Sequence, residues 1–296
     1  MLWFRKRSED VPLPAVADAI VPAELPVVLD PDLFRHYLKA VTEAAKDWGG
    51  IEAYLAAASA KQQLFAELLA PERLAGLTLE DMERLLDRVF TARRRLYPVL
   101  ESLGEARVRE ATHWLFTGPL PVAQRLQDFV DAMPGAGGMG REAVRAAAKM
   151  RRAAWDFAAE MLHFADPERY PLMARWVWDR ATQSGALREF IRGNDAMPEI
   201  PLTNAPETYE GARAWLAGQL RGEGVYRDLP LWIDLVQAQA YVTYLRSVAE
   251  GSLGGDFGRG AQPHEHVRKL LGIEPERPDG RTRVKKNATQ DTAAPA

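Results

Sequence analysis

Apolar residues recur every three or four positions along most of the chain, which is the spacing of one face of an α-helix. The run from Met82 to Val89 illustrates the pattern, and a capping box of Thr78 and Asp81 precedes it. Runs that alternate apolar and polar residues, as β-strands do, are missing from the sequence, and no segment repeats. The pattern predicts an all-α protein, a multi-helix globular bundle.

The periodicity divides the chain into helices with definable ends. In chain order, we expect helices from residue 32 to about 48, over 51–70, from the capping box to about 90, over 98–114, 122–133 and 141–164, from Pro171 to about 182, a short helix ending at 191, then helices over 207–221 and 229–250, and a short helix ending at 271. The helical periodicity extends furthest in the segment 141–164.

Proline and glycine mark the boundaries between the predicted parts of the chain. Residues 1–31 contain five prolines, so we expect an extended arm there, because proline blocks helix formation. The Gly118–Pro121 segment predicts a boundary between an N-terminal helical subdomain, 32–117, and a C-terminal helical subdomain, 118–273. Residues 274–296 are polar and predict a disordered tail.

A glycine-rich turn separates the two helices predicted at the centre of the chain. Gly135, Gly137 and Gly140 have the spacing of a dinucleotide-binding fingerprint. That site needs a buried strand before its glycines, and an amphipathic helix precedes them here. The backbone N–H groups of such a turn are suited instead to surround a phosphate, which makes Gly135 and Gly137 candidate phosphate-binding positions.

The helix after this turn carries a basic stripe. Its four members lie within about 80° of one another on a helical wheel: Arg141, Arg145, Lys149 and Arg152. The adjoining apolar stripe, which we expect to face the core, consists of Val144, Ala148, Trp155 and Leu162. With the glycine turn, the basic stripe predicts contact with nucleic acid or phosphate. The alternative is the solvated face of an ordinary amphipathic helix.

Two stretches of sequence around this helix match a known pattern. Residues 133–137, Met-Pro-Gly-Ala-Gly, are similar to the Leu-Pro-Gly-Val-Gly hairpin of helix–hairpin–helix modules, and Leu-His-Phe-Ala-Asp-Pro-Glu-Arg-Tyr-Pro follows at 162–171. Residues 133–178 therefore resemble helical domains related to helix–hairpin–helix DNA glycosylases. The resemblance places Met173 where those enzymes carry their catalytic aspartate. It implies a shared fold element without the glycosylase chemistry, and no catalytic residue is assigned.

Two Glu-x-x-His motifs, Glu110–His113 and Glu160–His163, point to a different chemistry. Paired motifs of this type bind two irons inside four-helix bundles. Helical phase opposes this reading, because both motifs are expected to face away from the apolar stripes and toward water. A di-iron carboxylate enzyme remains an alternative.

Composition limits the classes of function. The 296 residues are 47% apolar and 27% charged, as in soluble globular proteins, and the net charge of −3 gives no overall attraction to nucleic acid or anionic membranes. The absence of cysteine excludes disulfides and thiolate metal sites and suits the cytoplasm. No run approaches the roughly 20 apolar residues of a membrane-spanning helix.

These observations favour a non-catalytic accessory or scaffold protein without a cofactor, acting through contacts with a protein partner. A nucleic-acid-binding helical module is the first alternative, and the di-iron enzyme is the second. Most of the eight tryptophans are expected in the core, and an exposed one would be an interface anchor.

Overall fold

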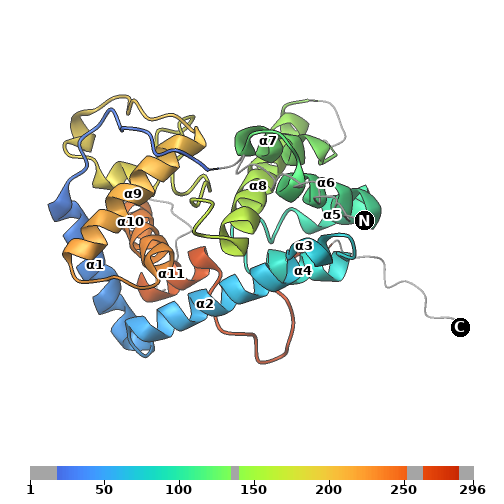
Figure 1. Ribbon diagram of the computed structural model, residues 1–296, viewed down its shortest axis with the longest axis horizontal. Helices are drawn as coiled ribbons and strands as arrows, with labels where there is room; N and C mark the ends of the chain where they lie inside the picture. The colour runs from blue at the N-terminus through green and yellow to red at the C-terminus, as the bar shows by residue number, and fades with distance from the viewer. Residues whose placement is uncertain (1–18, 135–139, 252–262, 287–296) are drawn as a thin grey trace, which may run out of the picture.

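The computed structural model describes residues 19–134, 140–251 and 263–286 (Figure 1). In chain order, the α-helices are α1 (Pro31–Ala45), α2 (Ile51–Leu68), α3 (Pro71–Leu74), α4 (Leu79–Asp87), α5 (Tyr97–Leu103), α6 (Glu105–Thr117), α7 (Val122–Ala132), α8 (Arg141–Ala165), α9 (Pro206–Gly222), α10 (Leu229–Gly251) and α11 (Pro263–Leu271). Short 3-10 helices cover Lys46–Trp48, Ala186–Phe190 and Asn194–Ala196. Within the described ranges the backbone forms no β-strand beyond two isolated bridges, so the all-α class is confirmed.

Local sequence signals set several of these helix ends. The capping box before α4 is formed, because Asp81 N donates to Thr78 Oγ1 and Thr78 N donates to Asp81 Oδ2, each at 3.1 Å. The helix predicted over 98–114 is two helices, α5 and α6, that meet at Gly104. Gly104 has a φ of +85°, a conformation that no residue inside a right-handed helix adopts.

The helix predicted after Pro171 is wrong, because residues 171–185 form turns and irregular backbone that lies largely in the core. Some of their backbone groups bond within the segment, as Asp179 N does to the carbonyl of Ser184, and others bond to side chains of other elements. Asp156 Oδ1 accepts from the amide of Arg175 at 2.8 Å, and the Tyr209 hydroxyl donates to the carbonyl of Trp178 at 2.9 Å. These side chains provide hydrogen-bond partners for buried backbone groups of the segment, which therefore do not need the hydrogen bonds of a helix.

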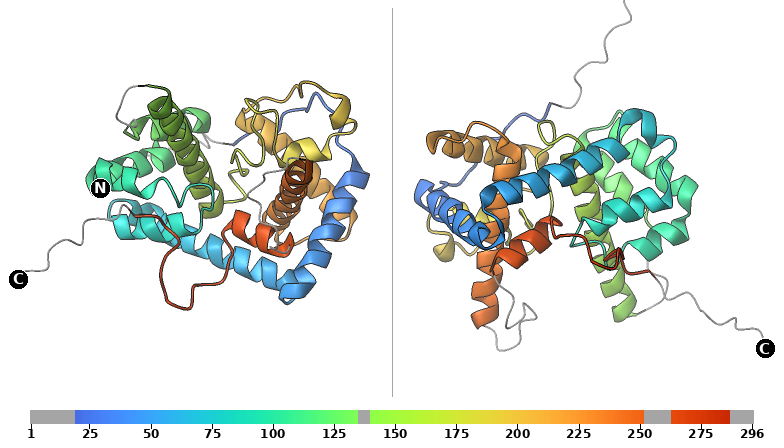
Figure 2. Two further views of the ribbon diagram at one scale, coloured as in Figure 1. Left: turned by 180° about the vertical axis from the view of Figure 1, so that it is seen from behind. Right: turned by 90° about the horizontal axis from the view of Figure 1, so that it is seen from below.

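The helices form two groups joined by α2 (Figures 1 and 2). In one group, α1 packs against α9, α10 and α11. In the other, α6 packs against α7 and α7 against α8, and α2 contacts both α8 and α10. The predicted boundary between residues 117 and 118 therefore does not separate the groups, since α6 and α7 lie on either side of it and pack together.

Arg125 explains why the chain remains in one group across this predicted boundary. Its side chain is fully buried on α7, and its Nη1 donates to the carbonyl of Leu115 at 2.6 Å and to that of Phe116 at 3.1 Å. Its Nε donates to the carbonyl of Leu120 at 3.0 Å. One guanidinium thus satisfies carbonyls at the end of α6 and in the Gly-Pro-Leu-Pro corner, which fixes α7 against α6.

Both ends of the described chain lie against the helices. Residues 19–30 contain no helix, as predicted for the arm, and Leu29 forms a bridge with Ile191. Residues 274–286 belong to the segment predicted as a disordered tail, and here the prediction is corrected. Glu274 pairs with Arg93 at 2.5 Å, and Lys286 pairs with Glu83 at 2.7 Å. Charges complementary to those around α4 hold this stretch in place.

Candidate functional site

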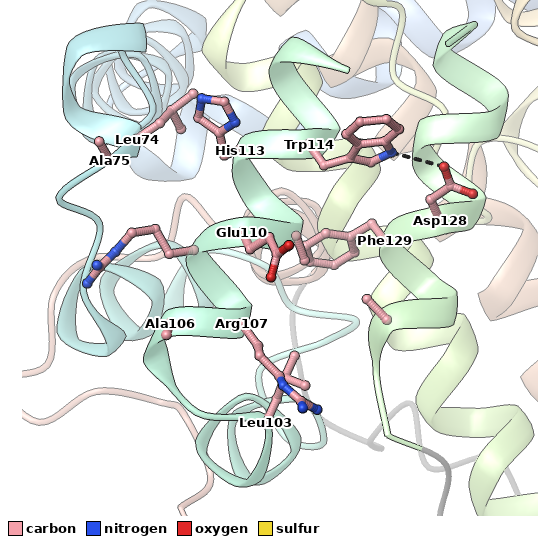
Figure 3. A pocket seen from close by; sticks show the side chains of 13 residues that line it. Leu74, Ala75, Leu103, Ala106, Arg107, Glu110, His113, Trp114, Asp128 and Phe129 are labelled. Atoms are coloured by element: carbon pink, nitrogen blue, oxygen red, sulfur yellow. Dashed lines mark hydrogen bonds between the residues drawn. The ribbon is translucent and has the colours of Figure 1, made fainter. Parts of the chain in front are cut away.

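A groove of about 840 Å³ lies over the outer face of α6 (Figure 3). Leu74 at the end of α3 borders one side, Phe129 of α7 lies on the other, and Leu103 of α5 lies at one end. The inner face of α6 packs against the core through residues such as Val108 and Leu115, so the opposite face of the helix points outward. Small side chains at Ala106, Ala111 and Ala132 keep the groove open.

Trp114 is the aromatic feature of this groove. Of the described tryptophans, it alone has more than a third of its surface exposed, at 39%. Its Nε1 donates to Asp128 Oδ2 at 2.9 Å, and Gln124 Nε2 donates to the other oxygen of Asp128 at 2.8 Å. The ring is therefore held in one orientation by α7 while part of it stays open to solvent (Figure 3).

Charged side chains are spaced along the groove and do not converge on one point. Arg107 lies near Leu103 at one end, Glu110 lies in the middle, and Asp128 lies toward Trp114 (Figure 3). Arg107 makes no ion pair with any described residue, whereas Arg109 is held by Glu105 at 2.7 Å. The groove thus presents an apolar floor with separated positive and negative positions.

The basic stripe of α8 is exposed, and its four members Arg141, Arg145, Lys149 and Arg152 make no ion pair within the part of the chain that the structure describes. The apolar stripe predicted beside it is partly wrong. Val144 is 69% exposed and Ala148 is also exposed, whereas Trp155 and Leu162 pack against the core. In the N-terminal half of α8 the buried side of the helix is the one that carries Met150, and Val144 and Ala148 lie away from that side. Gly135 and Gly137 lie outside the described residues.

The two Glu-x-x-His motifs lie in different environments. Glu110 and His113 are exposed and line the groove on α6. Glu160 and His163 are each only 1% exposed, which corrects the expectation that they face water. The prediction failed because the C-terminal half of α8 is enclosed by other elements on almost every side, so it has no polar face. In the described ranges, no group of three or more His, Asp or Glu side chains is placed to hold a metal ion.

Glu160 and His163 belong to a buried polar cluster that links four helices. Lys61 Nζ of α2 lies 2.6 Å from Glu160 Oε2 and donates to the carbonyl of Leu271 on α11 at 2.8 Å. His163 Nε2 lies 2.8 Å from Asp234 Oδ2 of α10. Burial lowers the pKa of Lys61 and raises the pKa of Glu160, while the attraction between the two groups opposes both shifts.

This cluster has no room for a substrate. The cavity beside His163 and Asp234 measures about 10 Å³, which is about the space of one water molecule. The side chain at the position that the glycosylase resemblance singles out, Met173, is also buried, and its carbonyl accepts a hydrogen bond from Trp155 Nε1 at 3.0 Å. The arrangement fits a role in joining the helices.

No protein-family model, curated protein or solved structure was found to match this chain. None of the helices in the described ranges combines the length and the apolar character needed to cross a membrane. The groove on α6 and the basic stripe on α8 are therefore weighed on their geometry alone.

Sequence patterns pointed to the basic stripe but missed the groove. Its one signal is the position of Trp114, which lies off the apolar stripe formed by Val108 and Leu115 on the same helix. An apolar aromatic residue out of phase with its helix is typical of a binding surface.

Proposed function

We propose that the protein is a non-catalytic accessory protein that binds a short segment of a protein partner in the groove over α6. The observation that carries the proposal is the partly exposed Trp114, held in orientation by Asp128 inside a groove with an apolar floor. Tryptophans in such positions are the residues that contribute most to binding energy at protein interfaces.

The size of the groove supports a short peptide segment as its occupant. From Ala106 to Trp114 the lining of α6 spans nine residues, or about 12 Å along the helix axis. That length matches about two turns of a partner helix, and an amphipathic helix laid in a groove is a recurrent mode of peptide recognition. The apolar face of such a helix would cover Trp114 and the alanines of α6.

The charges along the groove define the pattern expected on the partner. Arg107 favours an acidic residue at one end of the bound helix. Glu110 and Asp128 favour a basic residue about one or two turns further along. The order of these charges would set the direction in which the helix lies, because the reverse direction would place like charges together.

The test is selection of a random peptide library on the whole protein, followed by measurement of how the enriched peptides bind the Trp114→Ala variant. We expect enriched peptides that combine apolar residues at helical spacing with one acidic and one basic residue. Loss of the tryptophan should weaken their binding roughly tenfold or more, the loss typical of an interface anchor. Tyr226→Ala is the matched control, because Tyr226 is 71% exposed and lies between α9 and α10. Enriched peptides that bind the Trp114→Ala protein equally well would refute the groove.

A second candidate function is nucleic-acid binding by the basic stripe of α8. All four of its side chains are exposed and lack ion-pair partners among the described residues, which leaves them available to phosphates. We expect a gel shift at low salt that weakens with added salt and is reduced by Arg145→Gln combined with Lys149→Gln. Arg94→Gln with Arg95→Gln, on the connection between α4 and α5, is the control pair. A chain that shifts no DNA or RNA at low salt would exclude this function.

A further inference from the structure

Residues 272–286, here called the C-terminal strap, leave α11, pass beneath α2 and reach α4 (Figures 1 and 2). A Pro-Asp-Gly sequence at 278–280 turns the strap, and Gly280 N donates to the carbonyl of Arg277 at 3.0 Å across the turn. The turn brings Arg277 and Arg281 toward the same end of the strap. Arg283 then bonds through its backbone N–H to Asp87 of α4.

A pocket of about 240 Å³ lies between the strap and α4. Its lining contains five arginines and two carboxylates, a formal excess of three positive charges. Arg84 and Arg88 come from α4 and its end, and Arg277, Arg281 and Arg283 come from the strap. Elements far apart in the sequence therefore bring guanidinium groups to one cavity.

The ion pairs around the pocket neutralise only part of this charge. Arg283 lies 3.5 Å from Asp87, and Arg88 lies 3.2 Å from Glu276, so two of the five arginines have a carboxylate of the pocket beside them. The others are less well paired.

Arg281 has Asp279 at 3.9 Å and Arg84 has Asp81 at 3.8 Å; Arg281 is largely exposed and Arg84 is about half exposed. Such long pairs in water are weak. Arg277 makes no ion pair with a described residue, and its Nη1 reaches only the carbonyl of Thr282 at 3.4 Å. These three guanidinium groups therefore have no close carboxylate partner among the described residues.

We infer that this pocket binds a phosphate group carrying two or more negative charges, and that a diphosphate is the ligand it fits. Guanidinium groups bind phosphate oxygens through paired N–H donors, and several converging arginines match the oxygens of a diphosphate better than a single phosphate. The pocket is smaller than the roughly 300 Å³ at which cavities begin to enclose whole drug-sized ligands. It therefore holds the charged group, and the rest of a larger ligand lies outside.

Binding would also join the strap to α4. An anion between Arg84 on one side and Arg277 and Arg281 on the other would attract all three guanidinium groups. The bound state should therefore unfold at a higher temperature. This site is separate from the groove over α6, so the two proposals stand or fall independently.

The test is titration calorimetry of the full chain with inorganic diphosphate, ADP and adenosine at constant ionic strength. We expect diphosphate and ADP to bind at one site and adenosine not to bind. Arg277→Gln and Arg281→Gln should each weaken diphosphate binding about tenfold, the loss expected for a charged hydrogen bond. Both residues are exposed, so the variants should keep the melting temperature of the unliganded protein. Arg94→Gln, another exposed arginine, is the matched control.

Four results would overturn the inference. The first is an absence of diphosphate binding at physiological ionic strength. The second is an equal loss for Arg94→Gln and the two pocket variants, which would indicate nonspecific attraction. The third is binding of ADP that persists when both Arg277 and Arg281 are replaced, which would place the nucleotide elsewhere. The fourth is binding of a DNA duplex that depends on Arg281 while diphosphate does not bind, which would identify the ligand as a nucleic-acid backbone.

Discussion

Replacing Asp156 with asparagine should make the protein more stable above neutral pH. Asp156 lies on α8 and is only 4% exposed, and its carboxyl accepts a hydrogen bond from Arg175 N at 2.8 Å. Burial raises the pKa of this carboxyl from 3.8 to about 7, although the bond from Arg175 opposes the shift. Asparagine keeps the shape and the acceptor oxygen but has no charge to bury.

The sign and size follow from the difference in pKa between the folded and unfolded states. The folded pKa is the higher one, so the native state binds the proton more tightly, and stability falls as the pH rises from about 4 to about 7. A shift of about three units corresponds to about 4 kcal/mol. The free energy of unfolding of Asp156→Asn, relative to that of the wild-type protein, should therefore rise by about 4 kcal/mol as the pH increases from about 4 to about 8.

The measurement is urea unfolding of both proteins across this pH range, followed by tryptophan fluorescence. The quantity to plot is the difference between their free energies of unfolding, because titrations shared by the two proteins largely cancel in it. The difference should change through the interval between the two pKa values and level off on either side. A difference that stays constant with pH, or one that favours the wild-type protein as pH rises, would refute the reasoning.

Two further predictions concern the core and the strap. Glu160→Leu should destabilise the protein by about 3–5 kcal/mol, because it leaves Lys61 buried without its partner. Adding Lys61→Met should recover most of this loss, as measured by urea unfolding, and a double variant as unstable as the single one would contradict the prediction. Gly272→Ala should lower the melting temperature far more than Gly224→Ala. Both glycines have positive φ, but only at Gly272 would the added Cβ clash with a backbone atom, the carbonyl oxygen of Arg88. Equal losses for the two variants would show that this close approach is unimportant.

Local signals predicted the elements whose hydrogen bonds are local. The capping box at Thr78 acts within a few residues, and the sequence shows it directly. The break at Gly104 is equally local, but the single helix predicted over 98–114 overlooked it. Residues 171–185 could not be predicted in this way. Their conformation depends on Asp156 and Tyr209, which lie at a distance along the chain and bond to their backbone.

The same distinction applies to the candidate sites. Charges that project from an exposed helix follow from a helical wheel, and the basic stripe on α8 was predicted in this way. A groove depends on where neighbouring helices end, so no pattern within α6 indicates that Leu74 and Phe129 stand on either side of it. The burial of Glu160 was missed for a related reason, since its partner Lys61 precedes it by 99 residues.

The hydrogen bond from Lys61 to the carbonyl of Leu271 has a consequence for synthesis on the ribosome. These residues are 210 positions apart, so at about 5–20 residues per second roughly ten to forty seconds separate their translation. During that interval the ammonium group has no completed site to enter and stays in water. The helices from α3 to α8 can associate early and α1 can pack on α2, but the contacts of α2 with α10 and the bond from Lys61 to α11 form only after those helices have been made. A chain truncated before Leu271 lacks this acceptor for Lys61 and should therefore be more open to proteases along α2.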